Sequence, residues 1–131
     1  MQQLATGIAL WCFDREILDR NIYEGIAPHF SGAGPFHKHS GNIILCSSAI
    51  YLEGDEITKI PHTAIEQIFL GYDRIYTRSL VKNFGLFCQP LRINFEDKGI
   101  DESIYLIIDY HFMGTSNNQA WFNAIKDLLS D

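Results

Sequence analysis

The sequence predicts a mainly β domain that ends in a single α-helix, and three observations carry this prediction. Short apolar runs of strand length recur along the chain and are separated by turn residues. The segment 91–96 alternates between apolar and polar side chains, which is typical of a strand with one face on a core and one in water. The C-terminal segment instead places its apolar side chains at helical spacing.

Length and composition favour one folded domain. Of the 131 residues, 47% are hydrophobic and 20% are charged, a balance that excludes a disordered chain. Acidic residues outnumber Lys and Arg by 16 to 10, and the net charge of −6 disfavours a general nucleic-acid binder, which needs a basic surface. The sequence shows neither a secretory signal nor a stretch approaching ~18 apolar residues, which predicts an intracellular protein without a transmembrane segment.

The first third of the chain is the least regular part. Residues Gly7 to Phe13 read as a strand. The segment 14–24 fits either a short helix capped by Asp14 or a continuation of the strand, and the pattern leaves both open. Turn residues dominate from Pro28 to Gly41 and predict a loop.

The middle of the chain predicts three short strands. Residues 43–46 form an apolar run, residues 49–53 alternate, and residues 57–60 form a third run that Pro61 closes. The next segment is ambiguous. Thr63 to Glu66 has the form of a capping box that would start a helix, but a single helical turn followed by a strand through Leu70 fits equally well.

The last two strands and the helix have the clearest patterns. Residues 91–96 and 103–112 predict an antiparallel hairpin around the charged connection 97–102. A helix follows, with Ser116 as its cap and Gln119 completing a capping box. Its amphipathic stripe is formed by Trp121, Ala124, Ile125 and Leu128.

This order of elements resembles the pleckstrin-homology (PH) superfold, in particular the small bacterial PH-like and GRAM-like domains. Residues 41–54 look like the first hairpin of that family, and Ile57-Thr58-Lys59-Ile60-Pro61 followed by Ala64-Ile65-Glu66-Gln67-Ile68 looks like its next step. Trp121 matches the Trp that plugs the open end of the barrel in these domains. The resemblance implies a PH-like partly open barrel of two antiparallel sheets capped by the helix, and it favours the strand for residues 65–70.

The resemblance covers about residues 35–129 and sets the predicted domain organisation. The chain is a single PH-like domain over 1–131, in which residues 36–131 form the core and residues 1–35 form an N-terminal extension of undefined structure. The fold is shared by lipid binders, peptide binders and domains without a known ligand, so it does not by itself define a function.

Positive charge is concentrated in one segment. Arg74, Arg78 and Lys82 follow one another at intervals of four residues, which places them on one face of a strand and roughly so on a helix. Guanidinium groups suit phosphate and carboxylate oxygens, so these residues are the candidate ligand-binding site, for an acidic or phosphorylated peptide or an anionic lipid headgroup. The alternative is a solvated face paired with nearby acids such as Asp73 or Glu66.

Two other groups of residues suggest chemistry less strongly. His37 and His39, with His29 upstream, have side chains suited to a metal ion, but the spacing matches no metal motif, and a flexible polar loop is the competing interpretation. The three cysteines lie among apolar neighbours and no two have a CxxC spacing, so they are expected to be buried reduced thiols. They are Cys12, Cys46 and Cys88.

The sequence therefore predicts a cytoplasmic, non-enzymatic PH-like binding or scaffold module without a cofactor or a catalytic residue. Its expected partners are a protein or peptide, an anionic lipid surface, or a second copy of the chain, and an edge near Phe84 to Phe87 is the first candidate for such docking. The alternative from another class is a small enzyme that uses a cysteine or a metal-bound water.

Overall fold

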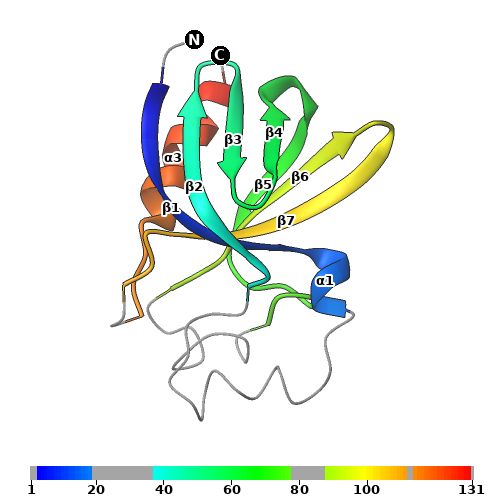
Figure 1. Cartoon of the computed structure of the whole chain (residues 1–131), viewed down its shortest axis with the longest axis vertical. Helices are drawn as coiled ribbons and strands as arrows, with labels where there is room; N and C mark the ends of the chain where they lie inside the picture. The colour runs from blue at the N-terminus through cyan, green and yellow to red at the C-terminus, as the bar shows by residue number, and fades with distance from the viewer. Residues whose placement is uncertain (1–2, 19–36, 78–87, 112–113, 131) are drawn as a thin grey trace.

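Seven strands form one antiparallel sheet, and one long helix packs against a face of it (Figure 1). The structure is a computed structural model that describes residues 3–18, 37–77, 88–111 and 114–130. The elements are β1 (Gln3–Phe13), α1 (Asp14–Leu18), β2 (His39–Cys46), β3 (Ala49–Glu53), β4 (Ile57–Pro61), η1 (His62–Ala64), β5 (Ile65–Leu70), β6 (Leu91–Asp97), β7 (Ile100–Ile108) and α3 (Asn118–Leu129). Neither helix among the described residues is long and apolar enough to cross a membrane. The predicted class, mainly β with a C-terminal helix, is confirmed.

The strand order is β4-β3-β2-β1-β7-β6-β5. Every neighbouring pair is antiparallel. The two groups of strands, which the sequence predicted as two sheets, are joined into one by the β1–β7 pair. β4 and β5 are the two edge strands, and η1 connects them along the chain. Because these two strands do not pair with each other, the barrel is only partly closed.

β1 lies at the centre of the sheet, between β2 and β7. The division into an extension 1–35 and a core 36–131 does not follow this arrangement, because it separates the central strand from its partners. Residues 41–54 lie in the β2–β3 hairpin, and β1 pairs with β2 on the other side of this hairpin. The pairing of β1 with β7 joins residues that are far apart in the sequence, as in the pair Ala9 with Ile108, and no local pattern reports such a contact.

The structure decides both ambiguous segments. Residues 14–18 form the short helix α1 rather than a continued strand. Residues 62–64 form a single 3-10 turn, and β5 follows through Leu70, as the resemblance favoured. The capping-box pattern at Thr63 does not start a long helix, because residues 65–70 pair with β6.

The β6–β7 hairpin is tighter than the charged connection suggested. Only Lys98 and Gly99 lie in its turn, and both have positive φ angles, 54° and 81°, as the favoured two-residue hairpin turn requires. β7 ends at Ile108 rather than continuing to residue 112. Asp109 has a left-handed backbone with φ of 53°, which takes the chain out of the strand.

Alternation along the strands gives the sheet two apolar faces, each with its own cluster. The inner cluster joins Trp121 and Ile125 of α3 to inward side chains such as Trp11 and Leu106. The outer cluster is smaller and covers the other face of β1 and β7. Its buried members are Cys12, Ile17, Tyr76, Cys88, Tyr105 and Ile107. The predicted helical stripe and the buried Trp121 are confirmed.

The start of α3 is fixed by the side chain of Asn118, which is 2% exposed. Its Oδ1 accepts a hydrogen bond from the N–H of Ile108 at 2.8 Å, and its Nδ2 donates to the carbonyls of Leu106 at 2.9 Å and Gln89 at 2.6 Å. The predicted capping box is wrong, since Asn117 is the N-cap residue and makes no side-chain cap bond. The Oγ of Ser116 instead accepts from the N–H of Asn118 at 3.3 Å.

Replacing Asn118 tests how much this contact stabilises the fold. Asn118→Ala leaves buried backbone groups at Ile108 and Leu106 without partners, so it should lower the free energy of unfolding by about 2–4 kcal/mol. Asn123→Ala, at an exposed position of the same helix, should change it by less than ~0.5 kcal/mol. Urea denaturation of both variants measures the difference, and an equal effect of the two would contradict this role.

Candidate functional site

A cleft of about 350 Å³ lies between the start of β2, the end of β1, α1 and the β3–β4 turn. Side chains from these separate elements meet there, and we call it the barrel-end cleft. Its described lining residues are Trp11, Phe13, Arg15, Glu16, His39, Asp55, Glu56 and Thr58.

Three rings form one side of the barrel-end cleft. Trp11 and Phe13 are two residues apart on β1 and therefore point to the same face, and His39 is the cross-strand partner of Trp11 on β2. The His39 ring stacks on Trp11 with centroids 6.0 Å apart and meets Phe13 edge-on at 6.2 Å. Trp11 is buried and belongs to the inner cluster, so this wall is continuous with the core.

Glu16 fixes the position of His39. One carboxylate oxygen of Glu16 accepts from the backbone N–H of Phe13 at 2.8 Å, which is the bond that a Glu at the third position of a helix makes to its N-cap. The other oxygen lies 2.7 Å from Nε2 of His39. A local helix-start interaction in α1 thus orients a side chain of β2.

Arg15 supplies the guanidinium group of the cleft, and the carboxylate of Glu102 balances its charge. Its Nη1 donates to both carboxylate oxygens of Glu102, at 2.8 and 2.7 Å, and its guanidinium lies 4.5 Å from the centre of the Phe13 ring. The hydrogen bond to Glu102 is the main cause of the raised pKa of Arg15.

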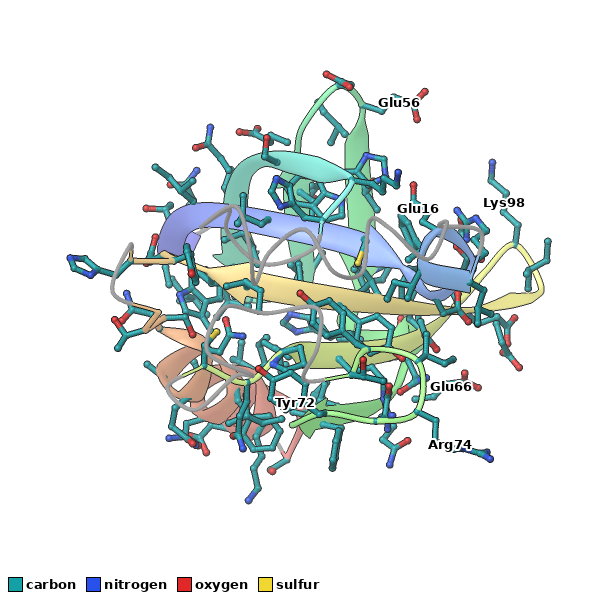
Figure 2. The ribbon with its side chains drawn as sticks, turned by 90° about the horizontal axis from the view of Figure 1, so that it is seen from below. Glu16, Glu56, Glu66, Tyr72, Arg74 and Lys98 are labelled. Carbon is teal, nitrogen blue, oxygen red and sulfur yellow. The ribbon has the colours of Figure 1, made fainter. Side chains whose placement is uncertain are left out.

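The β3–β4 turn supplies the rim. A Cβ atom added to Gly54 would lie 3.0 Å from the indole ring of Trp11, so the turn rests directly on this ring. The N–H of Gly54 also donates to the carbonyl of Glu56 at 3.1 Å and closes the turn. Asp55 and Glu56 are exposed, and neither forms an ion pair with another described residue. Figure 2 shows Glu56 at the tip of this turn.

Arg74, the one sequence-predicted ligand-binding residue that the structure describes, does not line the barrel-end cleft. Arg74 is exposed and follows β5 by a few residues, and Figure 2 places it far from Glu56. Arg78 and Lys82 lie outside the described residues, as does the segment 84–87 that was the candidate docking edge.

Asp73, next to Arg74, has a structural role. Its Oδ1 accepts from the N–H groups of Ile75 and Tyr76 at 2.9 and 2.7 Å, and its Oδ2 accepts from Arg92 at 2.9 Å and Tyr105 at 2.8 Å. Burial alone would raise the pKa of Asp73, but these hydrogen bonds outweigh it and the pKa is lowered. They hold the turn that places Tyr76 in the outer cluster.

The structure does not bring His37 and His39, the two described histidines of the predicted metal site, together with a third ligand around one position. His39 contacts Glu16, His37 is exposed, and His29 lies outside the described residues. Among the described residues the one group of three side chains close enough to share a metal ion is acidic and exposed: Glu66, Glu96 and Asp101. Repulsion from Asp101 is the main cause of the raised pKa of Glu66.

All three cysteines are buried and free of disulfides, as predicted. Burial raises the pKa of the Cys88 thiol, with an opposing hydrogen bond from Ser116. The carbonyl of Cys88 accepts a hydrogen bond from the hydroxyl of Tyr72.

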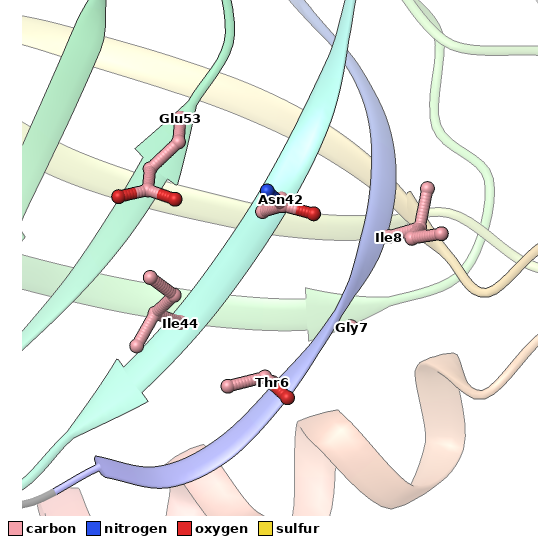
Figure 3. A pocket seen from close by; sticks show the side chains of 6 residues that line it. All are labelled: Thr6, Gly7, Ile8, Asn42, Ile44 and Glu53. Carbon is pink, nitrogen blue, oxygen red and sulfur yellow. The ribbon is translucent and has the colours of Figure 1, made fainter.

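A second, shallower pocket of about 300 Å³ lies on the outer face of β1, β2 and β3 (Figure 3). It is formed largely by exposed strand residues: Thr6, Gly7, Ile8, Asn42, Ile44 and Glu53. Ile8 is 65% exposed, and Glu53 is the one charged residue in this lining.

Sequence reasoning missed the barrel-end cleft, although part of its signal is local. Alternation in β1 places Trp11 and Phe13 together, and the spacing from Phe13 to Glu16 fits a helix start. The proximity of His39 and the β3–β4 turn follows only from strand pairing. No family model, curated protein or solved structure matches this chain.

The lowered pKa of Asp73 predicts a pH-dependent contribution to stability. The contribution is present above the pKa that Asp73 has in the unfolded chain and is lost as the pH falls through its lower folded value. Asp73→Asn should therefore cost about 1–3 kcal/mol at pH 7, and the difference from wild type should shrink below about pH 4. Urea denaturation from pH 7 to about pH 2 measures it, with the exposed Asp55→Asn as control; a pH-independent difference would disprove the assignment.

Proposed function

We propose that the chain is a cytoplasmic, non-enzymatic binding module of the PH-like class, and that its ligand site is the barrel-end cleft. The observation that supports this proposal is the fixed arrangement of its wall and rim. Glu16 holds His39, and Trp11 supports Gly54 in the β3–β4 turn.

A cleft held in this way favours binding. Association costs free energy whenever side chains or loops must be ordered, and positions that are already fixed avoid much of that cost. The strands of the barrel form a rigid scaffold. The residues of α1 and the β3–β4 turn, which this scaffold positions, would determine which ligand is bound. The cleft volume of about 350 Å³ is sufficient for one or two side chains of a partner.

Blocking the cleft tests this assignment. Thr58→Trp places a large ring in the cleft, and proteins that copurify with the wild-type chain from a native extract should be lost. Thr6→Trp, on the outer face, should retain them. The melting temperature of each variant is measured first, and equal values show that any loss of binding does not come from unfolding. Retention of the same proteins by Thr58→Trp would show that the cleft is not the ligand site.

Thiol reactivity tests the non-enzymatic part of the proposal against a cysteine-dependent enzyme. Because all three thiols are buried, labelling by a disulfide reagent at pH 7 should be at least ~100-fold slower in the native protein than in denaturant. Ser47→Cys adds an exposed thiol beside Cys46 and serves as the positive control. Rapid native labelling of Cys12, Cys46 or Cys88 would favour the enzyme.

A further inference from the structure

The barrel-end cleft has an excess of negative charge. Its described lining contains three carboxylates, from Glu16, Asp55 and Glu56, against one guanidinium, from Arg15. Glu102, outside the lining, already neutralises Arg15 with both of its oxygens. Glu16 lies 2.7 Å from Nε2 of His39, so the two remaining carboxylates are those of Asp55 and Glu56.

Asp55 and Glu56 therefore present charge that no described residue matches. Both side chains are exposed on a turn that Gly54 fixes against Trp11. Both residues line the same volume that the rings border.

The wall of the cleft is suited to a cation with an apolar stem. The guanidinium of Arg15 lies 4.5 Å from the centre of the Phe13 ring, so this wall already holds one cation against an aromatic face. The aliphatic stems of Lys and Arg pack on apolar surface while their charged ends remain near water and carboxylates.

We infer that the barrel-end cleft binds a Lys or Arg side chain from a basic segment of a partner protein. The inference rests on the proposed function and names the chemistry of its ligand. An anionic headgroup or a phosphopeptide entering the same cleft would meet Asp55 and Glu56 and be repelled. The sequence-based expectation of an acidic ligand concerned Arg74, Arg78 and Lys82. Arg74 does not line this cleft, and the other two lie outside the described residues.

The test uses the peptide acetyl-Gly-Arg-Lys-Arg-Gly-amide and the whole chain labelled for NMR. Binding should shift the amide signals of Gly54 and Asp55 and the indole N–H signal of Trp11, and should weaken between about 50 and about 200 mM salt. The double variant Asp55→Lys, Glu56→Lys should weaken binding by about tenfold or more, because it replaces attraction with repulsion.

A matched variant separates the cleft from general charge attraction. Glu66→Lys, Glu96→Lys changes the net charge by the same amount on exposed positions of β5 and β6 and should leave the peptide affinity within about twofold. Equal weakening by both double variants would overturn the inference, as would shifts confined to other residues.

Two further probes distinguish the ligand classes. The peptide acetyl-Gly-Glu-Asp-Glu-Gly-amide and vesicles containing phosphatidylserine should leave the cleft signals unchanged, and binding of either at Gly54 and Trp11 would overturn the inference. Absence of binding by the basic peptide would also overturn it. The proposed function would survive that result if Thr58→Trp still abolished partner capture.

Discussion

The structure depends on the buried amide of Asn118, because this side chain continues a β ladder where a strand is missing. β6 begins opposite Leu106, so β7 extends beyond it and Ile108 has no β6 residue to pair with. The amide accepts from the N–H of Ile108 and donates to the carbonyls of Leu106 and Gln89. Without the Asn118 amide, this N–H and these two carbonyls would lose a hydrogen-bond partner in a buried position, which lowers the free energy of unfolding.

The position of this amide also determines how α3 covers the inner face of the sheet. Asn118 is the first residue of α3, so anchoring it to β7 brings Trp121 and Ile125 onto the inner cluster. The opposite face of the same strands is covered by the outer cluster, to which Asp73 fastens the turn that carries Tyr76. β1 serves both faces, with Trp11 directed inward and Cys12 outward.

Local patterns predicted much of the fold and little of the site, for a physical reason. Alternation and helical spacing reflect burial within one element, and they correctly identified the strand at 91–96 and the stripe around Trp121. They could not identify β1 as the central strand, since its pairing with β7 is set by a distant segment. Two errors had a local cause: α3 begins at Asn118 with Asn117 rather than Ser116 as its N-cap, and the left-handed backbone of Asp109 ends β7 early.

Charge density in the sequence pointed to Arg74, whereas the cleft that we propose as the ligand site is lined by three acidic side chains and one basic one.

The contrast between two acidic groups shows what the barrel-end cleft adds. Glu66, Glu96 and Asp101 crowd one another on an exposed part of β5, β6 and β7, and their repulsion is expressed in the raised pKa of Glu66. Proton uptake or side-chain rotation into water relieves that repulsion without any ligand. Asp55 and Glu56 instead border a concave volume with an aromatic wall, on a turn that Trp11 supports. Trp11 is at once a core residue, part of the wall and the support of the rim, so the stability of the fold also maintains the shape and charge of the cleft.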